Sequence, residues 1–339
     1  MSKIYITAAA LIASMILFSG CNGRQSFEPE STHSASSYIS KHGRKAISVL
    51  RDGVTYDNGT YITRGGEGKI KIPEKFHFVA QSSSYVLAAD NTGQIKILGR
   101  SSGKVIQEAK LDYPLISALI RGKNIYYISQ DNVFGVYSMN AKKTTVSAKV
   151  GRAFAVDTRI ANPISLGSLL IVPTLDGKLL VISPSNPRAA RGMAIGSEYN
   201  MNNVIFLGKI GRTIIAATPR KLVSAAPGAM NKFEAPIADT VISGGNVYAL
   251  TVDGRVVKLN SYLKVLAQKK FPYAQFAALS VSNGKVFALD RSGALIVMDA
   301  NLKKSKIYDI GKVKSYSFAA GGRLYKDKEV VNLNSLSYE

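Results

Sequence analysis

Short apolar runs that end in glycine-containing turns recur along most of this chain. In the clearest copy, Val247–Thr251 precedes Asp253-Gly254, and a second run, Arg255–Asn260, follows. Runs of five or six β-branched, aromatic and aliphatic residues suit β-strands, and Asp-Gly or Asn-Gly pairs supply the positive φ that tight hairpin turns need. The other copies begin the corresponding strand at positions 86, 125, 169, 214, 286 and 324. The repeat therefore restricts the fold to a succession of small antiparallel sheets.

Each unit reads as four strands, and a period near 40 residues predicts a β-propeller. We count seven units, and therefore predict an all-β propeller of about seven four-stranded blades over residues 46–339. The last unit stops after its third strand, and an extra strand-like pair, Gly53–Tyr56 and Thr60–Ile62, precedes the first full unit. We expect an N-terminal strand to complete the last blade, because closure removes an open sheet edge.

Two further readings of the repeat stay open. A β-sandwich followed by a second β domain is the alternative architecture. The unit around Ile214 is degraded, with Pro219 at a turn position, and if it is exposed then Pro219–Met230 is a candidate docking loop.

The N-terminus has the layout of a secretory signal over residues 1–20: Lys3, then an apolar run Ile4–Phe18, then two small residues. The run is shorter than the roughly 20 residues that a spanning helix needs. Cys21, the only cysteine, follows directly. This arrangement resembles the lipobox of bacterial lipoproteins, which implies cleavage before Cys21 and acylation of its thiol by chains such as palmitate. A secreted protein with a chance cysteine and an uncleaved anchor are the alternatives.

The residues after Cys21 indicate in which membrane the protein is located and how its folded domain is attached. In the lipoprotein sorting rule, Asp after the cysteine retains the protein in the inner membrane, and this chain has Asn22. The resemblance therefore implies an outer-membrane lipoprotein that faces the periplasm, with the inner membrane and the cell surface as alternatives. Residues 21–45 are rich in Ser, Thr and Glu, so we interpret them as a flexible tether.

The chain is strongly basic, with 44 Lys and Arg against 22 Asp and Glu and a formal net charge of +22. The basic residues are scattered in short groups and form no arginine-aromatic module, so we expect no nucleic-acid partner. The simplest interpretation is that these basic residues lie on solvated loops and have no specific partner. An anionic envelope surface or an acidic partner is the functional alternative.

The units resemble the quinoprotein-type (PQQ-like) propeller repeat. Val247–Leu250 with Asp253-Gly254 matches the centre of that repeat, and Ser102–Val105 resembles its last turn, but the family's tryptophan is absent because the chain has none. A lipid-anchored propeller of this kind resembles the propeller lipoprotein of the Bam complex. The resemblance implies a non-catalytic, membrane-anchored scaffold that binds an envelope protein, in outer-membrane protein assembly. A secretion or flagellar component, a peptidoglycan or glycan binder and, less favoured, a quinoprotein-type enzyme are the alternatives.

Catalytic, metal and cofactor sites are not indicated by the residues. A quinoprotein enzyme of the family that this chain resembles would use a tryptophan and a vicinal disulfide. This chain has no tryptophan, and its single cysteine cannot form such a disulfide. No histidine spacing resembles a zinc site, and we interpret His77 as a strand residue. Four aspartates recur at turns, where side-chain hydrogen bonds to the backbone are their expected role: Asp90, Asp176, Asp253 and Asp290. We therefore predict no enzyme and no cofactor, and lipidation at Cys21 as the chemistry of the chain.

Overall fold

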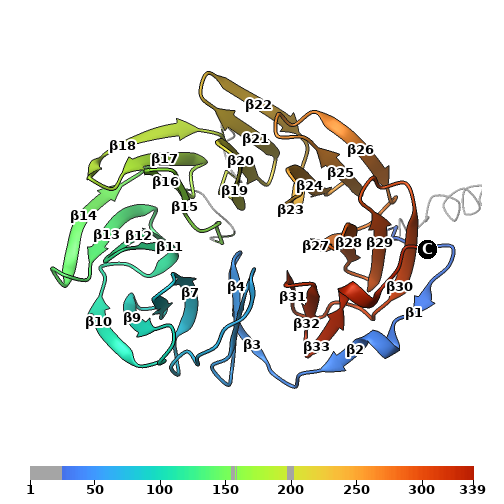
Figure 1. Ribbon diagram of the computed structural model, residues 1–339, viewed down its shortest axis with the longest axis horizontal. Helices are drawn as coiled ribbons and strands as arrows, with labels where there is room; N and C mark the ends of the chain where they lie inside the picture. Colours follow the sequence, from blue (N-terminus) through green and yellow to red (C-terminus); the bar gives the residue numbers. More distant parts are fainter. Residues whose placement is uncertain (1–24, 154–156, 158, 197–201) are drawn as a thin grey trace, which may run out of the picture.

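The computed structural model describes residues 25–153, 157, 159–196 and 202–339, and in these ranges the chain forms a ring of eight antiparallel sheets (Figure 1). We number the sheets as blades 1 to 8 in chain order. Blade 1 comprises β3 (Ala46–Val49), β4 (Gly53–Tyr56), β5 (Tyr61–Thr63) and β6 (Gly66–Glu67). Blade 2 comprises β7 (His77–Gln81), β8 (Tyr85–Ala89), β9 (Gln94–Gly99) and β10 (Val105–Lys110). Blade 3 comprises β11 (Leu115–Arg121), β12 (Asn124–Ser129), β13 (Val133–Ser138) and β14 (Lys143–Lys149). Blade 4 comprises β15 (Ile164–Leu166), β16 (Leu169–Pro173), β17 (Lys178–Ser183) and β18 (Asn186–Ala194).

The second half of the ring continues the same order. Blade 5 comprises β19 (Phe206–Ile210), β20 (Thr213–Thr218), β21 (Lys221–Ala226) and β22 (Ala229–Glu234). Blade 6 comprises β23 (Ile237–Ser243), β24 (Asn246–Thr251), β25 (Arg255–Leu259) and β26 (Val265–Lys270). Blade 7 comprises β27 (Phe276–Ser282), β28 (Lys285–Asp290), β29 (Ala294–Asp299) and β30 (Ser305–Asp309), with β1 (His33–Ser34) added to its edge. Blade 8 comprises β31 (Ser317–Ala320), β32 (Arg323–Lys326), β33 (Glu329–Asn332) and β2 (Ile39–Lys41). Two short 3₁₀ helices, η1 (Ser36–Tyr38) and η2 (Leu333–Ser335), complete the described elements.

The predicted all-β propeller is confirmed, but the expected count of about seven blades is wrong, because there are eight. The blade that was not predicted is blade 1, of which the sequence indicated only the strand pair at 53–56 and 60–62. Its four strands have only two to four residues each, and β6 consists of Gly66 and Glu67, so the outer half of the blade has no apolar run to detect.

The ring closes through the N-terminal segment, as expected. Ile39, Ser40 and Lys41 of β2 pair antiparallel with Val331, Val330 and Glu329 of β33, so β2 is the fourth strand of blade 8. The closing strand thus lies inside the range that we expected to be a flexible tether. The described part of that range, residues 25–45, follows the outside of blades 7 and 8 instead (Figure 1). Low apolar content suggested disorder, but a closing strand needs only a few backbone pairs, and Ala35 is fully buried between those blades.

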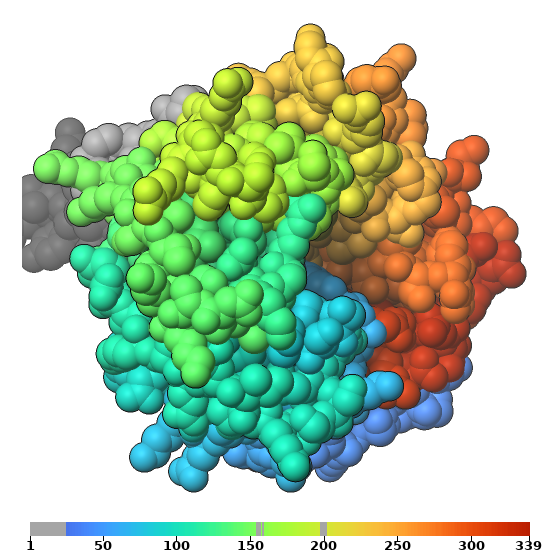
Figure 2. All heavy atoms as spheres, turned by 60° about the vertical axis from the view of Figure 1, so that its left-hand side comes forward, coloured from blue at the N-terminus to red at the C-terminus, as the bar shows by residue number. Residues whose placement is uncertain are grey.

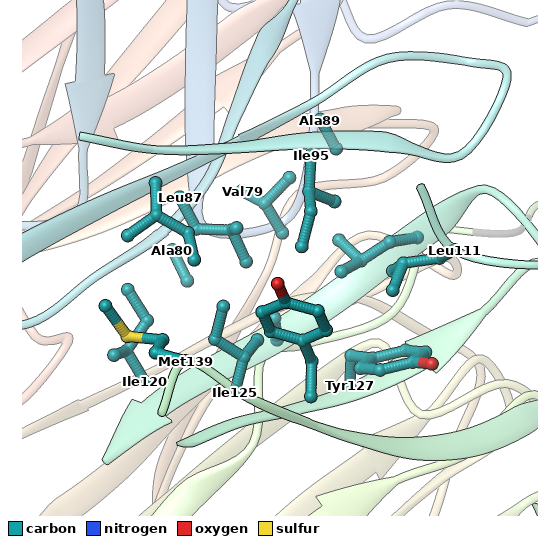
Figure 3. Packing of buried hydrophobic residues seen from close by; sticks show 14 residues of the cluster. Val79, Ala80, Leu87, Ala89, Ile95, Leu111, Ile120, Ile125, Tyr127 and Met139 are labelled. Carbon is teal, nitrogen blue, oxygen red and sulfur yellow. The ribbon is translucent and has the colours of Figure 1, made fainter. Parts of the chain in front are cut away.

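Eight hydrophobic clusters lie within the described ranges, one between each pair of neighbouring blades. Figure 3 shows the cluster between blades 2 and 3, where Leu87 and Ile95 face Ile125 and Tyr127. Because every blade buries both faces against its neighbours, the second and third strands are almost continuously apolar.

The antiparallel order gives the ring two distinct faces. The connection face carries the links from each outer strand to the next blade, together with the turns between second and third strands. The hairpin face carries the turns between first and second strands and between third and fourth strands. The hypothesis of a docking loop over Pro219–Met230 is wrong, because this stretch contains β21, which is buried, and the start of β22.

Candidate binding surfaces

The middle of the ring holds a cavity of about 1060 Å³. Its wall includes residues of the inner strands β3, β23, β27 and β31, and four arginines contribute to it: Arg51, Arg64, Arg159 and Arg291. Figure 2 shows the surface hollowed at the centre of the ring, between segments from both halves of the chain. The cavity is therefore the central channel of the propeller, and its mixed polar and apolar lining carries more cations than carboxylates.

Two of the channel arginines share one carboxylate. Arg159 contacts Asp157 at 2.8 Å and Arg51 contacts it at 3.3 Å, while the Arg51 Nε donates to the Arg159 carbonyl at 3.3 Å. Burial opposes ionisation of Asp157, but the hydrogen bonds from Arg159 and the charges of both arginines outweigh it, so the pKa of Asp157 lies below its ordinary value. The cluster is consequently a fixed, internally paired group.

Residues 159–163 cross the channel beside blades 2 and 3 and narrow it there. The Asn162 amide donates to the Val79 carbonyl of β7 at 2.9 Å and accepts from the Ala118 N–H of β11 at 3.1 Å. The backbone N–H of Asn162 donates to Asp52 at 2.7 Å. One side chain thus joins two inner strands that do not belong to the same sheet.

These channel residues were not found from the sequence. The arginines and Asn162 stand in no motif, because residues from blades 1 and 7 and from the link between blades 3 and 4 meet only after the ring has closed. One signal was present in the spacing: the intervals from 125 to 169 and from 169 to 214 are longer than the others, and the first contains the link that crosses the channel.

Blade 6 exposes apolar side chains at both of its ends. At the hairpin face, Tyr262, Val265 and Leu266 are 62%, 40% and 51% exposed, and we call these three residues the blade 6 patch. A β-bulge presents Leu266, because Lys258 pairs with Ala267 and Leu259 with Val265, which leaves Leu266 without an opposite residue, and Tyr262 lies in the turn before β26. At the connection face, Val252 and Tyr273 are 63% and 55% exposed. A similar bulge presents Ile106 on β10 of blade 2, at 55% exposure.

A second basic cavity of about 570 Å³ lies at the connection face near blades 8 and 1. Its lysines are Lys45, Lys312, Lys314, Lys326 and Lys328. Lys326 is buried and contacts Glu329 at 3.1 Å and Asp327 at 3.9 Å. The other four lysines are exposed, so this part of the surface carries an excess of positive charge.

The described chain begins at the connection face. Gln25 lines the central channel together with Tyr273, and it also lines a groove of about 800 Å³ between the outer strands of blades 6 and 7. Phe27 holds this segment through an edge contact with Phe271, at 5.9 Å between ring centroids. From there the chain leads to β1, which pairs parallel with β30.

The predicted lipidation site, Cys21, lies outside the described residues, as do residues 1–20. The three histidines are in strands or beside them and do not converge. His42 packs on Tyr56 with 5.2 Å between ring centroids, and its Nδ1 accepts from the Arg44 N–H at 3.1 Å. Burial, together with the charge of Arg44, lowers the pKa of His42. His77 is in β7, as expected for a strand residue, and burial lowers its pKa as well.

Of the four turn aspartates, Asp90 and Asp290 accept hydrogen bonds from the backbone as we expected, whereas Asp176 and Asp253 contact neighbouring side chains instead. Asp90 accepts from the N–H groups of Thr92 and Gln94 at 2.9 and 2.8 Å, and Asp290 accepts from the Ser292 N–H at 2.7 Å. Asp176 and Asp253 add ion pairs to Lys178 and Arg255 next to them. Within the described ranges, no group of three or more His, Cys, Asp or Glu side chains could hold a metal ion.

The part of the chain that the structure describes contains no helix with the length and apolar character to cross a membrane. Its two helices have three residues each.

Comparison with known proteins gives relatives in sequence and in structure. No protein-family model matches the chain. The plasminogen-binding protein PgbB of Helicobacter pylori strain J99 is 26% identical over 362 aligned positions, which cover 93% of this chain and 67% of PgbB. PgbB of strain 26695 is 25% identical with the same coverage. BamB from Moraxella catarrhalis superposes with a TM-score of 0.64 at 14% identity, over 86% of this chain and 96% of BamB. The chain therefore has a BamB-like propeller, which confirms that resemblance for the fold.

Proposed function

We propose that this protein is a lipid-anchored, non-catalytic envelope protein whose propeller binds a protein partner, with plasminogen as the first partner to test. The observation that carries the proposal is the alignment with PgbB, a plasminogen-binding protein, over 93% of this chain. Because 93% of this chain is aligned, the shared part includes most of the propeller and not only a peripheral segment.

The blade 6 patch is the surface that we assign to the partner. Val265 and Leu266 begin the edge strand β26 and Tyr262 lies in the turn before it, and an edge strand with exposed apolar residues can accept both side chains and backbone groups of another protein. Lys264 and Lys303 lie in the neighbouring turns at the same face and are exposed, which gives the patch a basic rim suited to an acidic surface.

Binding is tested with the full chain, purified from membranes in mild detergent and passed over immobilised plasminogen. We expect saturable binding that Tyr262→Ser with Leu266→Glu reduces at least several-fold. Ile106→Glu is the matched control, because Ile106 also stands on a β-bulge of an outer strand but on blade 2. Equal affinity of wild type and the blade 6 variant would remove the patch from the proposal. Absence of any plasminogen binding would remove plasminogen itself.

The anchor is proposed at Cys21, on the grounds of the lipobox-like sequence, and the outer membrane is the proposed location. We expect the wild-type protein to fractionate with membranes and to incorporate labelled palmitate, and Cys21→Ser to lose both properties. A Cys21→Ser protein that stays fully membrane-bound, with no palmitate label on either form, would refute the anchor.

A scaffold role in outer-membrane protein assembly is the second candidate. The exposed edges of β10 and β26 favour it, since a strand of another protein can pair with such an edge. Affinity purification of the tagged full chain in mild detergent should then recover an outer-membrane protein in a stoichiometric amount. Recovery of plasminogen-binding activity alone, with no such partner, would count against this candidate.

A further inference from the structure

The point where the N-terminal segment reaches the ring fixes one face of the propeller close to the lipid anchor. Gln25 lines both the channel and the groove between blades 6 and 7, at the connection face. Four Cα–Cα steps separate it from Cys21, and even a fully extended chain of that length spans only about 14 Å. An acyl group on Cys21 therefore holds the connection face of blades 6 and 7 within about 14 Å of the bilayer surface.

Apolar side chains stand on that face beside Gln25. Tyr273 lines the same two cavities as Gln25, and Val252 lines the channel with them. Both are more than half exposed. Tyrosine rings concentrate at membrane–water interfaces, where one end of the ring is apolar and the other can hydrogen-bond. Tyr273 and Val252 are thus placed to enter the headgroup region rather than to remain in water.

Positive charge continues from these residues along the same face. We call the five exposed cations Lys270, Arg291, Lys312, Lys314 and Lys328 the cationic arc. Lys270 and Arg291 line the channel mouth, and the other three line the basic cavity near blade 8. The two groups adjoin, because the Val313 N–H donates to the Arg291 carbonyl at 3.1 Å.

Three aspartates of this sector are engaged by the protein itself, whereas Glu28 and Glu30 line the groove beside Gln25 and are exposed. Asp253 contacts Arg255 at 2.9 Å, and Asp327 accepts from the N–H groups of Lys314 and Ser315. Asp309 accepts from the Gly311 N–H at 2.8 Å. The five cations of the cationic arc outnumber these two glutamates, so the face keeps an excess of positive charge that can attract an anionic surface.

From this geometry we infer that the connection face of blades 6 to 8 is a membrane-binding surface, in which Tyr273 and Val252 enter the interface and the cationic arc binds anionic lipid headgroups. The inference rests on the lipid anchor proposed above and adds an orientation to it. The blade 6 patch, at the other end of β26, then points away from the membrane and stays open to a partner.

The test uses the lipidated full chain in vesicles that contain phosphatidylglycerol and a nitroxide-labelled lipid with its spin label near the headgroup. Cys21 is the only cysteine and is acylated in the proposal, so an introduced cysteine is the only free thiol. A fluorophore on Tyr273→Cys should lose most of its intensity. The matched control is Tyr262→Cys, which has similar exposure on the hairpin face and should keep its intensity. Equal quenching of the two labels would overturn the orientation.

Charge reversal separates the cationic arc from the anchor. Lys270→Glu with Lys312→Glu and Lys314→Glu should abolish most of the quenching at position 273. Lys142→Glu with Lys264→Glu and Lys303→Glu, on the hairpin face, should leave it unchanged. Unaltered quenching in the first variant would refute the role of the arc. Flotation of the vesicles and the mass of the N-terminal peptide report the anchor independently: an unmodified Cys21 refutes the anchor and the orientation together, whereas an acylated protein without quenching at 273 refutes the orientation alone.

Discussion

The apolar interface between the first and last blades contains one hydrogen bond between two buried hydroxyl groups, and its removal is a quantitative test of how these blades pack. Tyr56 of blade 1 and Tyr316, just before blade 8, are joined through their hydroxyl oxygens at 2.7 Å. Tyr56 is fully buried and Tyr316 nearly so. Tyr56→Phe leaves the Tyr316 hydroxyl buried without its partner, which costs about 2 kcal/mol.

The double variant should be more stable than the single one. Tyr56→Phe with Tyr316→Phe removes both polar groups from an apolar cluster, so its free energy of unfolding should be within about 1 kcal/mol of wild type. Urea unfolding of the full chain, followed by circular dichroism, measures the difference. With an m-value of about 3 kcal/mol/M, the single variant should shift the midpoint by about 0.7 M. Tyr273→Phe, on the exposed face, is the control and should shift nothing. A double variant that loses as much as the sum of both single variants would refute the reasoning.

The same pair of tyrosines should make the free energy of unfolding fall at alkaline pH. Burial raises the pKa of Tyr56 from 10.0 to about 12, and burial with the hydrogen bond to Tyr56 raises the pKa of Tyr316 as well. Both tyrosines ionise more readily in the unfolded chain, so their contribution is complete below about pH 10 and is lost as the pH rises towards 12. We expect the double Phe variant to lose less stability than wild type over this interval, and an identical loss would contradict the assignment.

Three further perturbations test other parts of the structure. Burial lowers the pKa of His42, so the free energy of unfolding should fall as the pH drops below about 6.5. His42→Gln should reduce that loss of stability. His33→Gln is the control, because His33 is exposed in β1, and it should leave the loss unchanged. Asn162→Ala leaves two inner-strand backbone groups unpaired and should cost about 2 kcal/mol in urea unfolding, with Asn162→Asp restoring at most one of the two bonds. Gly135→Ala places a Cβ against the ring of Tyr127 and should lower the melting temperature by several degrees. Adding Tyr127→Leu should recover part of the lost melting temperature. An unchanged melting temperature for Gly135→Ala would contradict the packing.

The repeat made the architecture predictable, and its weakest copies set the limit of the prediction. Strands such as β24 and β28 are apolar on both faces because each blade is buried between two neighbours, and glycine turns bound them. Blade 1 has no such pattern in its outer strands, so the number of blades was wrong by one. The closing strand β2 was expected, but its position within residues 39–41 was not, because a strand held by three residue pairs needs no apolar signature.

The candidate surfaces were less predictable for a different reason. The exposed Leu266 looks in sequence like part of an ordinary apolar strand, and the bulge in the pairing with β25 leaves it without an opposite residue, whereas Tyr262 lies in the turn before β26. The channel arginines come from separate parts of the chain, and the ring alone brings them together. The turn aspartate Asp90, by contrast, acts through hydrogen bonds over two and four residues, and local interactions of this kind can be read directly from sequence.

The segment that closes the ring also determines how an anchored propeller would be held. A disordered tether of about 20 residues would let the body move about 25 Å from the membrane in any orientation. Here Ala35 is buried between blades 7 and 8, Phe27 contacts Phe271, and β2 is a strand of blade 8. A force on an anchor at Cys21 would therefore act on the ring itself near blades 6 and 7. It follows that the orientation of the body depends on packing rather than on linker length, so substituting Phe27 should loosen the orientation before it affects attachment.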